Sequence, residues 1–405
     1  MTFAAPPPVN CEPPNSHPPS ASCGSHIKLG LQWQPVGASM GIEMRAGAWR
    51  LLGVKLESGW EIIEPVGWDP SNGEKTDNYN GTGGHFSVAY IAERKGKRAF
   101  LKAIDLTSAM GAVDVLKALH EITSAHNFEA RLLEICEGDH MDRVVVALES
   151  GQVSVGPNLQ DAAPYLIFEL ADGDVRRRIQ KVNAAGRLAW WLRAMHHTAV
   201  GLSQLHSRRI AHQDLKPSNV LSFGMKEDFR VADLGRSVCD GTVGPHDDLM
   251  FSGDWGYAPP EILYGHIDPD FASRRLGCDL YLLGSMVFFF ATGFGCTQQL
   301  LARLDVAQRP KILRGTWSGS YETALPIIQT CFTDILAELE ASIPKPFSEE
   351  LTKAASELCN PNPVLRGHPL DRVPSGNQFS LVRYVSLFDR LAKRAEVTFR
   401  QDATS

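Results

Sequence analysis

The chain has 405 residues, a formal net charge of −6 and a hydrophobic content of 43%. Its length can hold two or three domain-sized units, or one two-lobed enzyme with extensions, and its composition is ordinary for a globular protein with a sizeable core. The negative net charge argues against general nucleic-acid binding, which needs a basic surface. The eight cysteines form no CxxC pair and no zinc-type spacing with histidine, which favours free thiols in a reducing cytosol. We therefore expect a cytoplasmic protein that does not bind nucleic acid.

The N-terminal region differs in composition from the rest of the chain. Residues 1–25 are rich in proline and serine and poor in aliphatic side chains, so we expect a disordered tail. A polyproline ligand for another domain is the alternative interpretation of this tail. Prolines 6–8 stand where a signal peptide would carry an apolar run. Residues 26–59 form an extension whose structure the sequence leaves open.

Regular elements begin near residue 60. Apolar, β-branched runs predict strands, and apolar residues at helical spacing predict one helix in the first half. The predicted strands are 60–66, 81–93, 98–105, 144–148 and 165–170, and the predicted helix is 112–137. After Asp172 the chain turns mostly helical, with predicted helices at 187–206, 259–264, 277–292, 297–305, 322–342, 347–359 and 378–398.

This order of elements predicts an α+β, two-lobed fold. We place a small β-rich lobe at 60–169, a larger helical lobe at 170–398 and a tail at 399–405. The most membrane-like segment, 280–294, is too short to span a bilayer, which takes about 20 residues. We therefore expect a buried core helix there and no membrane contact. Short basic clusters at 176–178, 208–209 and 274–275 are interpreted as solvated faces, with docking of an acidic substrate or a nucleotide as the alternative.

The most informative stretch is 210–221, which reads IAHQDLKPSNVL. A β-branched run is followed by a carboxylate (Asp214), an ammonium two residues later (Lys216) and an amide five residues later (Asn219). This spacing suits phosphoryl transfer, which needs a base beside the attacking hydroxyl, a cation near the moving phosphoryl group and an oxygen ligand for Mg²⁺.

The stretch resembles the HRDxKxxN catalytic loop of the eukaryotic-like (Hanks-type) serine/threonine protein kinases, here of a stand-alone type that occurs in bacteria. Four further motifs follow the family's order over about residues 60–370. They are the glycine-rich turn with Gly81, Gly83 and Gly84, Lys102 in AFLK, the DLG of Asp233 to Gly235, and APPE ending at Glu261 with a late arginine, Arg366.

The resemblance implies a role for each of these residues. Asp214 is the base and Lys216 stabilises the transferring group, with Asn219 and Asp233 holding Mg²⁺. Lys102 grips the ATP phosphates and needs a carboxylate on the next helix; Glu121 and Glu129 both qualify, and we select Glu129. The nucleotide site is expected to use the glycine turn, Ala89, the hinge residues Glu169 to Ala171 after Phe168, and Leu221 beneath the adenine. His212 and Asp279 support the loop, and Glu261 pairs with Arg366.

Four departures from the family's pattern involve five positions. Gln213 replaces the arginine that receives an activating phosphate, so phosphorylation of Ser237, Thr242 or Ser252 need not switch the protein on. Asp254 replaces a threonine and is expected to pair with Lys216. Phe100 and Ala89 replace an alanine and a valine over the adenine, which keeps the total volume similar; without such compensation Phe100 fills the site. Ser87 replaces the third glycine.

The sequence thus predicts a serine/threonine protein kinase that uses Mg²⁺ and ATP and acts on a protein hydroxyl. Two alternatives stay open: a pseudokinase scaffold that binds protein partners or nucleotide without turnover, and a kinase of small-molecule hydroxyls. The set of Lys102, Asp214, Asn219 and Asp233 favours catalysis over the scaffold, and the APPE segment favours a protein substrate. The sequence leaves the oligomeric state open.

Overall fold

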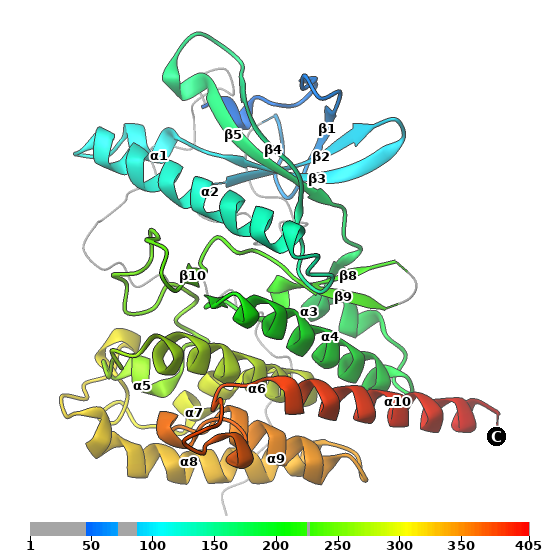
Figure 1. Ribbon diagram of the computed structural model, residues 1–405, viewed down its shortest axis with the longest axis vertical. Coiled ribbons are helices and arrows are strands. Elements are labelled where there is room, and N and C mark those ends of the chain that lie inside the picture. Colours follow the sequence, from blue (N-terminus) through cyan, green and yellow to red (C-terminus); the bar gives the residue numbers. More distant parts are fainter. Residues whose placement is uncertain (1–45, 72–86, 225–226, 405) are drawn as a thin grey trace, which may run out of the picture. The chain divides into compact units, whose positions relative to one another are not determined.

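The computed structural model describes residues 46–71, 87–224 and 227–404, with side chains as far as residue 398. The chain divides after Val36 into two units, and every described residue belongs to the second, Gly37–Ser405. Within this unit a β-rich lobe precedes a helical lobe, which confirms the predicted α+β, two-lobed arrangement (Figure 1). The expected tail at 1–25 and the three glycines at 81, 83 and 84 lie outside the described residues.

The first lobe is built on an antiparallel sheet of five strands in the order β1-β2-β3-β5-β4. Ala89 of β2 lies opposite Lys102 of β3, and Phe100 of β3 lies opposite Phe168 of β5. Side chains alternate between the two faces of a strand and paired residues share a face, so these four residues line one side of the sheet. The strands are β1 (Glu61–Pro65), β2 (Ser87–Arg94), β3 (Lys97–Ile104), β4 (Ala147–Ser154) and β5 (Ala162–Glu169).

A short helix, α1 (Thr107–Met110), and a long one, α2 (Val115–Gly138), follow β3. The long helix begins three residues later than predicted, because the Asp114 carboxylate accepts a hydrogen bond from the backbone N–H of Lys117 (3.0 Å) and caps it. Its second half buries Phe128, Glu129 and Leu132. The helix thus carries one acidic side chain on its buried face, and Figure 1 shows it lying below the sheet toward the second lobe.

Residues 46–59, expected as part of an extension of open structure, belong to the β-rich lobe. Ala48 and Leu51 are fully buried in the same core as Trp60. The Tyr90 hydroxyl donates to the Ala48 carbonyl (2.7 Å), and the Trp49 indole donates to the Asp105 carboxylate (2.7 Å). This segment therefore packs against the sheet and reaches the residue at which β3 leads into α1.

The strand predicted at 144–148 is wrong in its position. β4 covers Ala147–Ser154, while Val144 and Val145 pair with Val231 of the second lobe. The backbone N–H of Val145 donates to the Val231 carbonyl (2.8 Å). An apolar β-branched run predicts a buried extended segment, but the run does not say which neighbour it pairs with.

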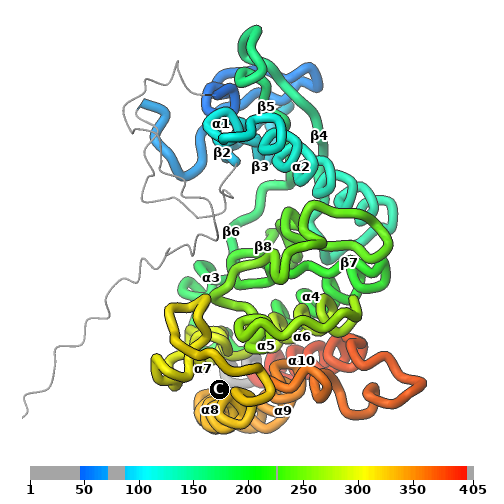
Figure 2. Tube along the Cα trace, turned by 90° about the vertical axis from the view of Figure 1, so that its left-hand side faces the viewer, coloured from blue at the N-terminus to red at the C-terminus, as the bar shows by residue number. Residues whose placement is uncertain are grey.

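The second lobe contains the predicted helices and three short strand pairs. Its helices are α3 (Val175–Arg178), α4 (Arg187–Ser207), α5 (Pro260–Leu263), α6 (Gly277–Thr292), α7 (Cys296–Arg303), α8 (Tyr321–Ser342), α9 (Ser348–Leu358) and α10 (Val382–Thr404). Its strands are β6 (Gly173–Asp174), β7 (Ile210–Ala211), β8 (Val220–Phe223), β9 (Asp228–Val231) and β10 (Val238–Cys239). Figure 2 shows β6, β7 and β8 at the level where the two lobes meet.

The last helix differs from the prediction at both ends. α10 begins at Val382 and continues to Thr404, so the residues expected as a tail from 399 are helical as far as Thr404. The helix lies along α4, and Arg193 of α4 contacts Asp389 (3.1 Å) and Glu396 of α10. The end of the chain is therefore anchored to the core of the second lobe through α4.

The stretch Ala272–Thr292 is long and apolar enough to cross a membrane by length and composition. However, 83% of its most apolar window is buried inside the protein. Helix α6 is the central helix of the second lobe and is covered on all sides, so its apolar residues need no lipid.

Candidate active site

Lys102 lies at the centre of a cluster of charges between the sheet and the second lobe. Its Nζ contacts both carboxylate oxygens of Glu129 (2.9 and 3.0 Å) and Oδ1 of Asp233 (3.2 Å). The structure places Glu129 at the lysine, whereas Glu121, the other candidate, lies two helical turns away with its side chain exposed. Strand β3, helix α2 and the loop after β9 therefore each contribute one charged group.

Burial and the neighbouring charges both shift the pKa values of the three groups in this cluster. Burial lowers the pKa of Lys102, but Asp233 and Glu129 outweigh it and the net shift is upward. Burial raises the pKa of Glu129 in spite of the nearby ammonium. Burial also acts upward on Asp233, yet Lys102 brings the net pKa of Asp233 below its usual value. The lysine is therefore firmly charged, and Asp233 is held ionised.

The loop 210–221 presents Asp214 near the same cluster of charges, because Asp233 lies close enough to act on its pKa. Asp214 is 8% exposed, and its carboxylate accepts hydrogen bonds from the Asp254 backbone N–H (2.8 Å) and from Asn219 Nδ2 (3.1 Å). Lys216 Nζ lies 3.0 Å from the second carboxylate oxygen. Burial raises the pKa of Asp214, and Lys216 opposes that shift. A carboxylate so held keeps one orientation toward the cleft.

The loop itself is supported from beneath. Asp279 of α6 accepts hydrogen bonds from the backbone N–H groups of His212 (2.7 Å) and Gln213 (2.8 Å). The His212 ring contacts the Ala232 carbonyl (3.0 Å) through Nε2 and accepts from the Asp214 N–H (3.2 Å) through Nδ1. These contacts join the catalytic loop to the residue before Asp233, as the resemblance implies for His212 and Asp279.

The DLG segment has a backbone that brings Asp233 into the cleft. Asp233 has φ of 67°, in the left-handed region that non-glycine residues rarely occupy. At Gly235 a Cβ would lie 3.2 Å from both Asp233 Oδ1 and Glu129 Oε2. Glycine at this position therefore leaves room for two carboxylates to approach the same ammonium.

Asp254 and Gly253 bring the segment 233–261, which the resemblance identifies as the activation segment, against Asp214. The Asp254 carboxylate lies 3.5 Å from Lys216 Nζ, which is the pairing expected from the departure at this position. A Cβ at Gly253 would meet the Gln213 carbonyl oxygen at 2.1 Å, so this approach needs glycine. Burial lowers the pKa of Lys216, but Asp214 and Asp254 outweigh it and the net shift is upward.

The residues that the resemblance assigns to the nucleotide form an apolar surface. Phe168, Ala171 and Leu221 pack around a small cluster of Val145, Phe223 and Ala232 where the lobes join. The Glu169 side chain is held by Arg230 of β9 (2.8 Å). Phe100 and Ala89 share the sheet face with Lys102, as the register requires. Whether this pair leaves room for a purine stays a prediction.

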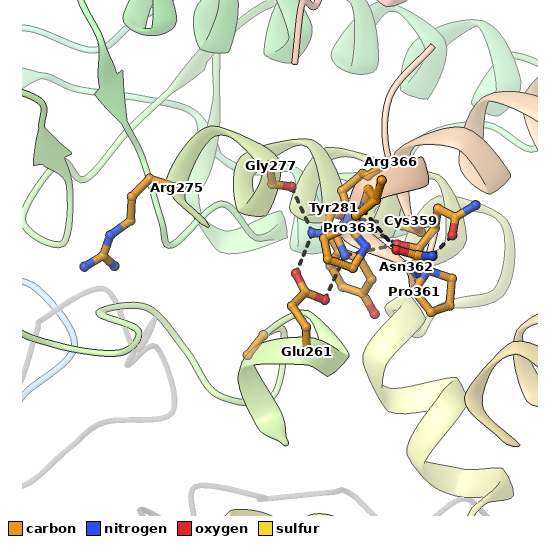
Figure 3. A network of polar contacts seen from close by, with 12 residues as sticks. Glu261, Arg275, Gly277, Tyr281, Cys359, Pro361, Asn362, Pro363 and Arg366 are labelled. Atoms are coloured by element: carbon orange, nitrogen blue, oxygen red, sulfur yellow. Dashed lines mark hydrogen bonds and ion pairs between the residues drawn. The ribbon is translucent and has the colours of Figure 1, made fainter. Parts of the chain in front are cut away.

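The Glu261–Arg366 pair lies deep in the second lobe, as the resemblance implies. Two parallel hydrogen bonds join the side chains (2.6 and 2.8 Å), and the guanidinium also donates to the carbonyls of Gly277 and Asn360 (Figure 3). Arg366 is fully buried. The pair ties the end of the activation segment to the loop that follows α9.

The sequence did not single out Arg275 or Arg230. The cluster at 274–275 was interpreted as a solvated face, but Arg275 is only 3% exposed and contacts Gln213 (3.2 Å). A dibasic pair just before an apolar helix is the one signal that could have marked it. The clusters at 176–178 and 208–209 are more exposed and form ion pairs with nearby aspartates.

Comparison with known proteins agrees with this geometry. Residues 83–369, more than half of the chain, match the protein kinase domain. The chain is 26% identical over 242 residues to LysM domain receptor-like kinase 10 of Oryza sativa subsp. japonica, which covers 57% of this chain and 35% of that protein. It is 29% identical over 163 residues to Cell division control protein 2 homolog 3 of Trypanosoma brucei brucei, covering 39% of this chain and 51% of that protein.

A third relative is Cyclin-dependent kinase 1 of Encephalitozoon cuniculi, 35% identical over 104 residues, which are 25% of this chain and 34% of that protein. The matched regions thus span between about a third and a half of the length of these three relatives.

Proposed function

Since the chain belongs to the protein kinase family, we propose that it transfers the γ-phosphoryl group of ATP to serine or threonine hydroxyls of a protein substrate. One observation carries the proposal. Lys102 contacts Asp233, Asn219 contacts Asp214, and Asp233 lies close enough to Asp214 to act on its pKa, so four side chains from three separate parts of the chain come together. In this reaction class the protein contributes mainly positioning and electrostatic stabilisation, and these four side chains supply both.

Asp214 is the base in this proposal. Its hydrogen bonds from Asp254 and Asn219 aim the carboxylate, so it can accept the proton of an incoming hydroxyl. Lys216, beside it, offers an ammonium to the charge that develops on the transferred group. A lysine two residues after the base matches the serine/threonine-directed members of the family, which supports that acceptor class.

The residues present also fit a magnesium ion. Asn219 directs its NH₂ to Asp214 (2.8 Å to the carbonyl), and its oxygen accepts a hydrogen bond from Ser218 Oγ (3.3 Å) but keeps a second lone pair for a cation. The Asp233 side chain is 38% exposed. A carboxylate and an amide oxygen are the hard ligands that Mg²⁺ accepts in proteins. Within the described ranges no group of three His, Cys, Asp or Glu side chains could hold a metal, so ATP phosphates would supply further ligands. Bound Mg²⁺ neutralises charge on the phosphate oxygens.

A reducing, cytoplasmic setting belongs to the proposal. Six cysteines of the described part, at 136, 239, 278, 296, 331 and 359, are free thiols. Burial raises the pKa of the Cys136 thiol to about 12, so this thiol stays protonated and unreactive. Buried unreactive thiols are compatible with a compartment in which disulfides do not form.

The test identifies the acceptor. The purified chain is incubated with labelled ATP, Mg²⁺ and a mixture of serine, threonine and tyrosine peptides, and the phosphorylated residue is mapped by mass spectrometry. Lys102→Met and Asp214→Asn serve as controls, and a small-molecule extract is assayed in parallel. Label on serine or threonine in the wild type alone supports the proposal.

Two results would replace it. Label only in the small-molecule extract would favour a kinase of small hydroxyl compounds. No label in any sample, together with no thermal shift by nucleotide, would favour a scaffold that binds protein partners.

A further inference from the structure

Arg275 joins the activation segment to the catalytic loop. It lies on the π-helical turn Ala272–Leu276 that leads into α6, and it is 3% exposed. Its Nη2 donates to the backbone carbonyls of Leu249 (2.9 Å) and Asp247 (3.1 Å), and its Nη1 donates to Gln213 Oε1 (3.2 Å). Figure 3 shows its side chain extending away from the Glu261–Arg366 pair.

Gln213 completes the connection. Its side-chain NH₂ donates back to the Arg275 carbonyl (2.9 Å), so the two residues are joined in both directions. Gln213 is fully buried, has φ of 65° and immediately precedes Asp214. A continuous set of hydrogen bonds therefore runs from the carbonyls of 247 and 249 through Arg275 to the residue that sets the backbone of the base.

This arrangement is unusual for a buried cation. Within the part of the chain that the structure describes, no carboxylate lies within ion-pair distance of Arg275. Burial, with Arg274 close by, lowers the pKa of Arg275 to about 10, so the side chain is still charged at neutral pH. Its planar group offers five N–H donors, and backbone carbonyls and one amide are its acceptors. Without Arg275 the Asp247 carbonyl loses this donor, whereas the Leu249 carbonyl keeps a hydrogen bond from Arg274.

Other contacts of the segment join residues within it. The His246 ring contacts the Gly235 carbonyl (2.9 Å), and the Ser252 hydroxyl donates to the Arg236 carbonyl (2.7 Å). Ser237 is fully buried and Ser252 is 5% exposed. Of the three hydroxyls considered as modification sites, two are therefore already enclosed in the ordered segment.

We propose that Arg275 is a positioning residue that holds residues 246–249 against Gln213 and thereby orders the activation segment without phosphorylation. The inference deepens the proposed function, because the ordered segment supports Asp214 through Gln213 and Asp254. In the resembled family an arginine beside the base receives a phosphate from this segment. Here an arginine on the turn before α6 reaches the segment and donates to backbone carbonyls instead.

Three variants of the full chain test the inference. Arg275→Met removes the donors. Gln213→Asn keeps a residue that tolerates φ above zero but is too short to contact Arg275. Arg193→Met is the matched control, a partly buried arginine that joins α4 to α10 far along the chain from the activation segment. Each is compared with the wild type before and after phosphatase treatment, by hydrogen exchange of residues 244–252 and by steady-state kinetics.

The expected pattern separates positioning from general destabilisation. In Arg275→Met, and to a smaller degree in Gln213→Asn, exchange of 244–252 becomes faster by about tenfold, which corresponds to the loss of a hydrogen bond to a charged group. The kcat falls while the KM for ATP stays near the wild-type value, because the nucleotide contacts remain. Arg193→Met changes neither quantity, and phosphatase treatment leaves the wild type unchanged.

The contrary results are distinct. Wild-type exchange of 244–252 in both variants would overturn the inference, and so would a wild type that loosens there after phosphatase treatment. If Arg275→Met does not fold, Gln213→Asn decides alone. If the wild type transfers no phosphate yet the exchange pattern appears, the positioning role of Arg275 stands and the proposed function fails.

Discussion

The Glu261–Arg366 pair gives the sharpest prediction for stability. In Glu261→Gln, the fully buried guanidinium of Arg366 loses its counter-charge. The guanidinium keeps three kinds of acceptor, namely the side-chain amide oxygen of the new glutamine and the backbone carbonyls of Gly277 and Asn360. Breaking a buried ion pair by removing one partner costs about 3–5 kcal/mol. The retained acceptors place this variant at the lower end, so we expect the free energy of unfolding to fall by about 3 kcal/mol.

A double-mutant cycle followed by urea denaturation tests the magnitude. Arg366→Met alone leaves the Glu261 carboxylate, 7% exposed, without its partner and should cost at least as much. In Glu261→Gln/Arg366→Met neither charge remains, so the combined loss should be smaller than the sum of the single losses by about 2 kcal/mol. Strictly additive losses would refute the reasoning, as would a loss of less than about 1 kcal/mol in Glu261→Gln, the range typical of exposed pairs.

Three further predictions concern the cleft and the pH dependence. Gly235→Ala adds a Cβ within 3.2 Å of Asp233 and Glu129. The rate of phosphotransfer in this variant should therefore fall by about tenfold or more, which corresponds to about 1.4 kcal/mol in the transition state. The melting temperature should change little. An unchanged rate would contradict the crowding argument. Ala89→Val should weaken ATP binding, measured by calorimetry, because overpacking costs about 1–3 kcal/mol. Adding Phe100→Ala to this variant should restore the affinity. Equal ATP affinities in the single and the double variant would show that the two residues do not share the adenine site. Burial, with Arg143 close by, lowers the pKa of His197 from 6.5 to about 3, so its stabilising effect is complete above pH 6.5 and is lost as the pH falls toward 3. Urea denaturation should therefore show a shallower pH dependence over that range for His197→Asn than for the wild type, and identical slopes would argue against a buried neutral imidazole.

The parts of the site that sequence predicted best are those with fixed local spacing. Asp214, Lys216 and Asn219 lie within six residues, so any backbone that forms the loop brings them together. The choice of Glu129 over Glu121 was less secure, because both lie on the same helix. The buried face of α2 decides between them, because Glu129 is buried beside Lys102 whereas Glu121 is exposed.

What sequence could not predict depends on partners far away in the chain. Val144 and Val145 read as a strand of the sheet, but they pair with Val231, 87 residues after Val144. The residues near Trp49 looked like a loose extension, although the Asp105 carboxylate and the Tyr90 hydroxyl hold them against the sheet. Arg275 looked like one of a solvated pair of arginines. In each case the pattern predicted the chemical character of a segment and left its neighbour undetermined.

The most direct test of the central claim is the rate of phosphotransfer in Asp214→Asn at saturating MgATP. Nucleotide occupancy is checked in the same samples by thermal shift. We expect the rate to fall by about 10²–10⁴-fold, the usual contribution of a positioned general base, with the nucleotide-induced shift unchanged because Asp214 is not placed among the phosphate-binding residues. An Asp214→Asn variant that transfers phosphate as fast as the wild type would contradict the assignment of this cleft as the active site.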